Sequence, residues 1–168
     1  MAVSMYQLSV PVFVRGLGTL DHYLDAIADF ARVNALDPAK LLQARLAPDM
    51  LSFSGQVRCA TDTAKNAIAR LSGVEAPRLE DGDGTVDALR ARLDATIAFV
   101  QSATAQLQGS ESRPVAFTFD ARQTTLRGDE YMLAFALPNF FFHVATGHDI
   151  LRHNGVPLGK TDYLRLSA

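Results

Sequence analysis

Three histidines near the end of the chain are the residues best suited to acid–base or metal chemistry. His143, His148 and His153 are spaced five residues apart. Each residue of a helix turns about 100°, so a step of five turns a side chain by about 140°. The three side chains therefore cannot share one face. Only His143 falls on the apolar face of its helix, and we expect His148 on the opposite side and His153 near the helix end.

Two neutral side chains are expected beside this imidazole. Asn139 lies one helical turn before His143, and Gln56 borders the apolar face of an earlier helix. We predict that Gln56, Asn139 and His143 converge in the interior, in or beside a pocket, as a small-molecule site. One imidazole and two amides bring no negative charge to a dication, so His143 and Asn139 could hold a divalent metal only weakly. The alternative is a metal-free hydrogen-bonded network with a neutral His143.

Other polar residues favour structural roles. We expect His22 on a solvated face, paired with Asp25. Asp62 faces away from the apolar side of its helix, so we expect a surface ion pair with Arg58 or Lys65. The single cysteine, Cys59, has no catalytic partner near it in sequence and is expected at the edge of the core.

Apolar residues at helical spacing predict four long helices, at about 3–34, 50–72, 86–108 and 130–153, the last of them interrupted or restarted at Pro138. A short helix is expected at 38–45, a hairpin within 110–128, and an irregular tail at 156–168. Four amphipathic helices with short connections predict an all-α four-helix bundle, forming a single domain over residues 1–168.

Composition excludes several classes of protein. The 168 residues carry 16 basic and 18 acidic side chains, a net charge of −2, so no basic surface for nucleic acid is expected. One cysteine excludes an intrachain disulfide. The sequence shows no membrane span and no convincing targeting segment, so we expect a cytoplasmic protein.

Several segments resemble a bacterial family of domains of unknown function in the DinB/YfiT-like superfamily, a group of proposed metalloenzymes. The most specific are PNFFFH at 138–143, ILRHNGV at 150–156 and Gly159-Lys160; the others are Arg45–Met50, Gln56-Val57, Asp62, Ala64-Lys65 and Ala69–Leu71. The resemblance implies an up-down-down-up bundle, a homodimer, and a metal held by three histidines. Two of those ligand positions map onto Asn139 and His143, whereas the second helix here has no histidine.

Three functions remain open at this stage. The first is an enzyme that uses a divalent metal or a bound water, with His143 as ligand or general base. The second is a metal-free bundle that binds a small molecule or a protein partner. The third is a structural or regulatory homodimer, because Phe140, Phe141 and Phe142 point about 100° apart and cannot all enter one core.

Overall fold

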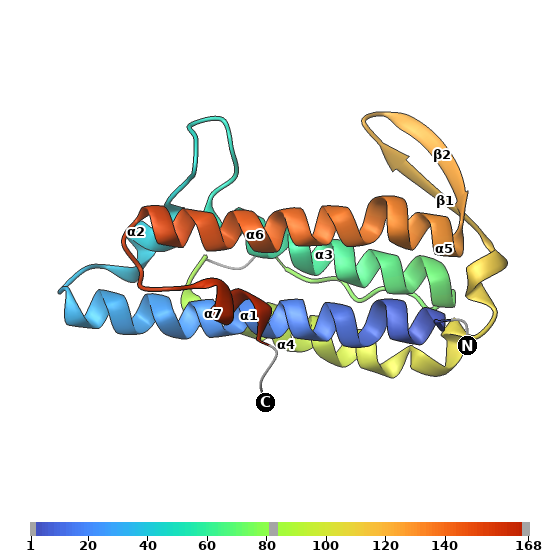
Figure 1. Cartoon of the computed structure of the whole chain (residues 1–168), viewed down its shortest axis with the longest axis horizontal. Helices are drawn as coiled ribbons and strands as arrows, with labels where there is room; N and C mark the ends of the chain where they lie inside the picture. The colour runs from blue at the N-terminus through green and yellow to red at the C-terminus, as the bar shows by residue number, and fades with distance from the viewer. Residues whose placement is uncertain (1–2, 81–83, 166–168) are drawn as a thin grey trace.

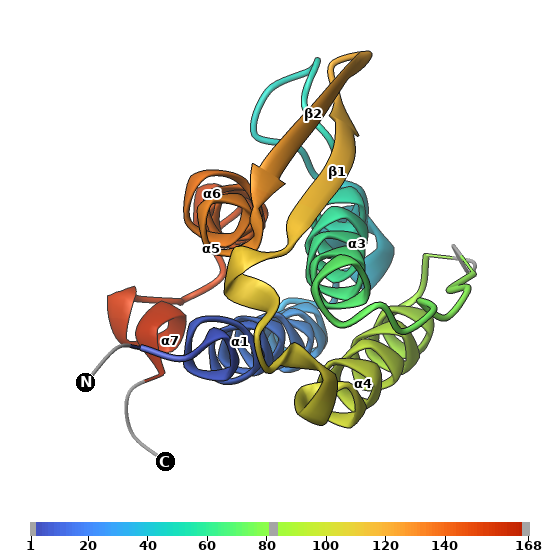
Figure 2. The same cartoon turned by 90° about the vertical axis from the view of Figure 1, so that its right-hand side faces the viewer.

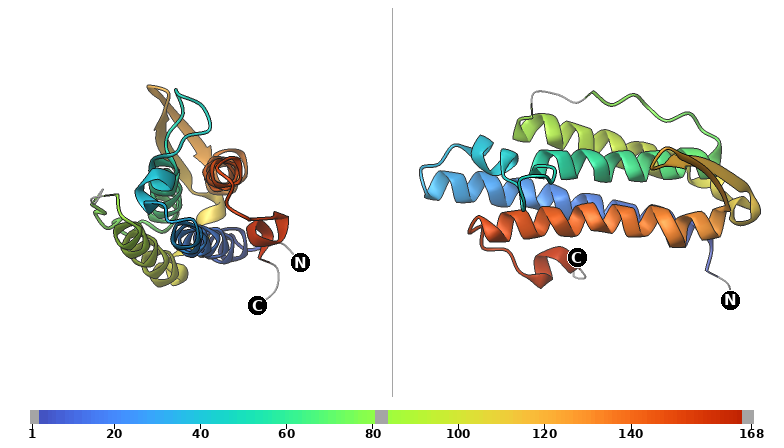
Figure 3. Two further views of the ribbon diagram at one scale, coloured as in Figure 1. Left: turned by 90° about the vertical axis from the view of Figure 1, so that its left-hand side faces the viewer. Right: turned by 90° about the horizontal axis from the view of Figure 1, so that it is seen from above.

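The computed structural model describes residues 3–80 and 84–165, and four long helices account for most of it. They lie side by side, as the end-on view shows (Figure 2). Following the chain colours, α1 and α6 run in one direction and α3 and α4 in the other (Figures 1 and 3). The long helices are α1 (Met5–Val33), α3 (Phe53–Ser72), α4 (Val86–Ser102) and α6 (Leu137–His153); a short helix, α2 (Pro38–Gln43), links the first two.

Side-chain caps define where these helices begin and end. Ser52 caps α3 by accepting from the amide of Gly55, and Thr85 caps α4 in the same way. Gly73 closes α3 with φ of 76°, a left-handed conformation that favours glycine. Asp37 caps α2 by accepting from the Ala39 amide, ahead of Pro38 in the first turn.

The predicted apolar faces form the core, with two corrections at helix ends. Along α1 the face from Val10 to Ala31 is buried, but Tyr6 at its start is 45% exposed. The predicted third helix, 86–108, ends as an α-helix at Ser102 and continues as a 3-10 turn, η1 (Thr104–Leu107). Ala103 and Leu107, which follow the end of α4, are buried all the same.

A β-hairpin precedes the last long helix, as predicted for 110–128. A 3-10 turn, η2 (Ser110–Ser112), leads into β1 (Pro114–Phe119), which pairs antiparallel with β2 (Arg122–Arg127). The two turn residues, Asp120 and Ala121, have φ of 48° and 60°. Positive φ at both central positions suits the right-handed twist of a two-residue hairpin. The hairpin extends from the bundle at one end of α3 and α6 (Figure 1).

The segment predicted as a helix over 130–153, interrupted or restarted at Pro138, is built from three pieces. A short α5 (Gly128–Tyr131) and a π-helical segment, η3 (Met132–Ala136), lead directly into α6. Pro138 lies in the first turn of α6 and has no amide to donate to the preceding turn. The wider π turn before it provides another hydrogen-bonding pattern, in which the Leu137 amide donates to Met132.

The tail is not irregular throughout, which corrects the prediction for 156–168. Lys160–Leu164 form a short helix, α7, that lies beside α1 (Figure 2). The carboxylate of Asp162 accepts a hydrogen bond from the Gly159 amide at 2.7 Å and stabilises the first turn. In the ranges 3–80 and 84–165, no helix is both long enough and apolar enough to cross a membrane.

Candidate functional site

Helices α3 and α6, with α5 continuing the line of α6, are joined by three side-chain hydrogen bonds, which we call the α3–α6 ladder. Its α3 members are seven residues apart, so they share one face of the helix. The bonds join Gln56 to His143, Thr63 to Asn139, and Arg70 to Tyr131, each with a length of 2.8 Å.

The first bond determines how His143 is protonated. Oε1 of Gln56 faces Nδ1 of His143, while Nε2 of Gln56 donates to the carbonyl of Leu51 at 3.2 Å. The Leu51 carbonyl can only accept, so it fixes the orientation of the Gln56 amide. His143 must then donate from Nδ1, and its Nε2 carries the lone pair. Gln56 is only 1% exposed, so this arrangement is held within the packed interior.

The lone pair of His143 faces an accessible space. Within the described part of the chain, no buried side-chain nitrogen or oxygen lacks a hydrogen-bond partner. Nε2 of His143 forms no hydrogen bond with any described residue. Because every buried side-chain nitrogen and oxygen of this part of the chain has a partner, Nε2 is not buried and is open to solvent. Burial of the ring lowers the pKa of His143, which keeps the imidazole neutral near pH 7. A neutral imidazole with a free Nε2 can accept a hydrogen bond, accept a proton or bind a metal.

A cavity of about 240 Å³ lies along the ladder. Most of its wall comes from α3 and α6, and the remainder from the hairpin, α5 and η3. The lining residues are Cys59, Asp62, Thr63, Asn66, Arg70, Thr118, Tyr131, Phe135, Asn139 and His143.

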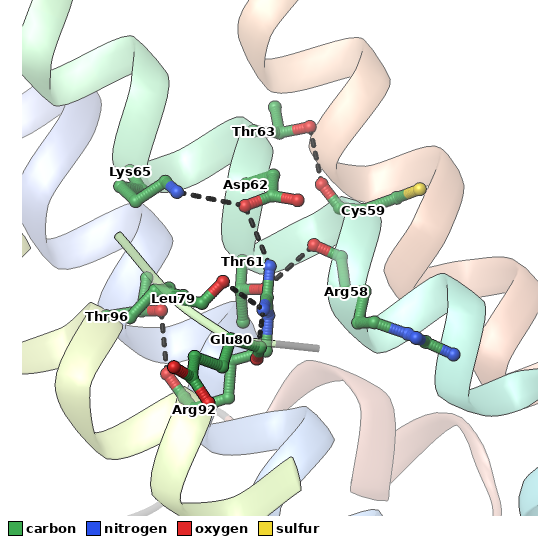
Figure 4. A network of polar contacts seen from close by, with 10 residues as sticks. All are labelled: Arg58, Cys59, Thr61, Asp62, Thr63, Lys65, Leu79, Glu80, Arg92 and Thr96. Atoms are coloured by element: carbon green, nitrogen blue, oxygen red, sulfur yellow. Dashed lines mark hydrogen bonds and ion pairs between the residues drawn. The ribbon is translucent and has the colours of Figure 1, made fainter. Parts of the chain in front are cut away.

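Asp62 is the only carboxylate among the described residues of this lining, and it is paired with two cations. Oδ1 of Asp62 lies 2.8 Å from Arg92 and 3.1 Å from Lys65 (Figure 4). The Arg92 side chain is 4% exposed and also donates to Thr61 and to the carbonyls of Leu79 and Glu80. Asp62 therefore does not form the purely surface pair with Arg58 or Lys65 that was predicted. Lys65 is a partner, but a buried arginine from α4 is the closer one.

The other charged residue of the lining is Arg70, at the hairpin end of the cavity. Its guanidinium lies 5.8 Å from the ring centre of Tyr131 and 6.0 Å from that of Phe117. One of its terminal nitrogens donates to the Tyr131 hydroxyl. These contacts orient an exposed arginine against a wall of aromatic rings.

The predicted site residues are brought together in part. Gln56 and His143 are in direct contact, and Asn139 lies in the same cavity wall. The Asn139 amide donates to Thr63 rather than to His143 or Gln56. The cavity lies in the groove between two helices, where Asn139 and His143 are half-buried, and not at the centre of the bundle.

The sequence analysis missed Thr63, Arg70 and Tyr131 as members of this site. The seven-residue spacing of Gln56, Thr63 and Arg70 was a usable signal, because it places all three on one face of α3. Cys59, expected at the core edge, lies in the same lining, and burial raises the pKa of its thiol.

Two other histidines make contacts that differ from those expected. His22 pairs with Asp162 of α7 at 3.0 Å, whereas the predicted partner Asp25 binds Arg90. His148 does not lie on an outer face. It is half-buried against α1, where its Nδ1 is 2.8 Å from the hydroxyl of the buried Tyr23.

Comparison with known proteins identifies the family. The model of a domain of unknown function, DUF1993, matches residues 5–164. The chain belongs to the DUF1993 family. A crystal structure of a DinB family member from Shewanella denitrificans is similar to this DUF1993 chain, with 34% identity and a TM-score of 0.88. The similarity covers 95% of this chain and 91% of the other. No curated protein matches this DUF1993 chain significantly.

DinB-like folds are associated with metals in general, so the residues of this DUF1993 chain were compared with the needs of a metal ion. Among the residues that the structure describes, no three histidine, cysteine, aspartate or glutamate side chains are grouped closely enough to hold one. Asp62 is already bound to two cations, and Asn139 offers only an amide oxygen. One imidazole with such neighbours does not fit a tight three-histidine zinc site.

Proposed function

We propose that the α3–α6 cavity binds a small polar molecule, with His143 Nε2 accepting a hydrogen bond or a proton from it. The observation that carries this proposal is the bond between Nδ1 of His143 and Gln56, which leaves Nε2 as an acceptor at the cavity. Ligand pockets usually measure about 300–1,000 Å³ and contain a few converging polar groups, so this cavity, at about 240 Å³, suits a molecule at the small end of that range.

The remaining groups of the cavity would orient the ligand. Asn139 retains an amide oxygen after donating to Thr63, and Asn66 adds a second amide in the same wall. If the protein is an enzyme, His143 would act as its general base, because a neutral imidazole can take a proton near pH 7. If it is a binding protein, the same atom would accept a hydrogen bond from a hydroxyl or amine of the ligand.

We further propose that the four long helices form the up-down-down-up bundle of the DinB/YfiT-like superfamily. We also propose that the α3–α6 cavity works without a tightly bound metal. His143 and Asn139 would remain the residues to which a divalent ion binds weakly. Protein purified without an affinity tag or added metal should contain far less than one zinc per chain by elemental analysis. Stoichiometric zinc would contradict this part of the proposal.

The test of the ligand site is a fragment screen by NMR on isotope-labelled protein. Polar fragments should shift the signals of the His143 ring and the Asn139 amide. The variant His143→Ala should lose this binding and stay folded, while His153→Ala, an exposed site on the same helix, should keep it. Fragments that bind equally well to both variants, or that never shift the cavity signals, would overturn the proposal.

A second candidate is a structural or regulatory role as a homodimer. It is favoured by two exposed aromatic residues, one on α6 and one on the hairpin. Phe140 packs edge-to-face against Phe13 in the core, and Phe141 is half-buried. Phe142 and Phe119, however, are 56% and 58% exposed in the single chain. We propose that a second copy of the chain covers Phe142. Sedimentation at tens of micromolar should give a dimer, and Phe142→Ser should weaken it; a monomeric parent protein would exclude it.

A further inference from the structure

We propose that the ligand of the α3–α6 cavity is a small carboxylate, bound through Arg70 and carrying a hydrogen-bond donor for His143. This inference rests on the proposed function and adds the chemical class of the ligand. It comes from the charges along the cavity wall and from the hydrogen-bond donors that Arg70 leaves unused.

Arg70 has donors to offer. A guanidinium carries five N–H groups in a rigid fork, and Arg70 uses one terminal nitrogen on the Tyr131 hydroxyl. Within residues 3–80 and 84–165, neither Nε nor the other terminal nitrogen has a hydrogen-bond partner, and no carboxylate pairs with Arg70. The edge formed by these two nitrogens matches the two oxygens of a carboxylate.

The rest of the cavity leaves this charge uncompensated. Asp62 and Arg70 are the charged residues of the lining, and His143 is kept neutral by burial. The Asp62 carboxylate is bound by Arg92 and Lys65 on the side of α3 that faces α4 (Figure 4). Among the residues that the structure describes, the Arg70 guanidinium is thus the one charge in this wall that lacks a counter-ion.

Size and charge favour a carboxylate over a phosphate. A cavity of about 240 Å³ admits only a small molecule. A phosphate ester carries up to two negative charges and is usually bound by several donors, such as a helix N-terminus together with a basic residue. The wall here offers one arginine and neutral amides and hydroxyls. At the other end, Nε2 of His143 can only accept, so a ligand that spans the cavity must present a hydroxyl, amine or thiol there. Gln56 and Arg70, which mark the two ends, are separated by about 21 Å of helix rise, so the ligand must carry the two groups at opposite ends of an extended chain.

The test compares charged probes with neutral copies of the same shape. 6-Hydroxyhexanoate and 8-hydroxyoctanoate, their amides, and inorganic phosphate are titrated into the full-length protein, with NMR shifts of the cavity residues as the readout. The hydroxy acids should bind at least tenfold more tightly than their amides, because a hydrogen bond to a charged group is worth a factor of about ten or more. Phosphate should bind more weakly than either acid.

Variants assign the effect to Arg70. Arg70→Met should weaken binding of the hydroxy acids tenfold or more and leave the amides unchanged. Arg152→Met removes an exposed arginine of α6 outside the cavity and should change every affinity less than twofold. Arg70→Lys, which keeps the charge but loses the fork, should give an intermediate affinity and guards against a folding defect in the methionine variant.

The outcomes separate this inference from the proposed function. Equal affinity for acids and amides, tighter binding of phosphate, or no difference between Arg70→Met and Arg152→Met would overturn the carboxylate assignment. In the first case, loss of amide binding in His143→Ala would still support the proposed function. If none of the four organic probes shifts the cavity signals at 50 mM, the carboxylate assignment fails, and the fragment screen alone decides on the site.

Discussion

Nδ1 of His143 lies 2.8 Å from Oε1 of Gln56, and the Gln56 amide is oriented in turn by the carbonyl of Leu51. A residue of α6 thus owes its tautomer to a backbone group that precedes α3. Metal-bound and catalytic histidines commonly depend on such a partner at their second nitrogen. In this chain the partner is a neutral amide, so the imidazole gains an orientation without gaining a counter-charge.

Gln56→Glu should raise the pKa of His143 above its value in the parent protein. The new carboxylate would face the Nδ1–H, and an opposite charge at hydrogen-bond distance favours the imidazolium. Titration of the ring by NMR measures the change. Gln101→Glu adds the same charge to an exposed position of α4 and should have little effect. An unchanged or lowered His143 pKa in Gln56→Glu would contradict the assigned contact between His143 and residue 56.

The unfolding free energy should decrease as the pH falls below about 6.5. Burial lowers the pKa of His143 in the folded state, while the unfolded chain keeps the ordinary value of about 6.5. Between these two pKa values the unfolded chain binds more protons, so stability is fully present above pH 6.5 and is lost as the pH falls. His143→Gln should show a smaller loss in urea unfolding between pH 7.5 and 5.5; an identical slope would argue against a buried, neutral His143.

Arg92→Met should destabilise the protein by roughly 2–4 kcal/mol, because it leaves the Thr61 hydroxyl and two carbonyls without their donor. Arg90, two residues earlier on α4, is the matched control. Its side chain is 34% exposed and pairs with Asp21 and Asp25, so Arg90→Met should cost about 1 kcal/mol or less. Urea unfolding of both variants measures the difference. Equal decreases in unfolding free energy would show that the buried contacts of Arg92 stabilise the protein no more than the exposed ion pairs of Arg90.

Gly16 and Gly18 should respond oppositely to replacement by alanine. A Cβ at Gly16 would lie 2.3 Å from the ring of Phe140, whereas one at Gly18 would meet nothing within 4 Å. Gly16→Ala should therefore lower the unfolding free energy by about 1–3 kcal/mol through overpacking of α1 against α6. Gly18→Ala should be neutral or stabilise by up to about 1 kcal/mol, since alanine favours the helix. Thermal unfolding of the two variants gives the sign directly.

The helices were predictable from sequence because their apolar residues recur at the helical period. The apolar residues of α3 that recur at this period, such as Phe53, Val57 and Leu71, are buried in the structure. The same periodicity placed His143 and Asn139 on the apolar face of their helix and Gln56 at the edge of the apolar face of α3, and Gln56 does contact His143. Local spacing thus carried enough information for contacts between two facing helices.

Contacts that depend on an irregular turn were not predictable in this way. On a uniform helix, Tyr131 would lie about 80° around the axis from Asn139, eight residues later. The π segment between them turns less per residue and helps bring Tyr131 into line with the ladder. Arg92 was missed for another reason. Its partners come from α3 and from the connection that follows, and no periodic pattern in α4 reveals them.

Arg92 also affects a stretch of chain with no regular structure of its own. Residues 74–80 form neither helix nor strand, yet the carbonyls of Leu79 and Glu80 accept hydrogen bonds from the Arg92 guanidinium. The same guanidinium also binds side chains of α3. This contact works as a non-covalent cross-link, since it shortens the length of backbone that can move independently once the helices have formed. The entropy of ordering this connection is therefore lost together with the packing of α4 on α3, in one cooperative event.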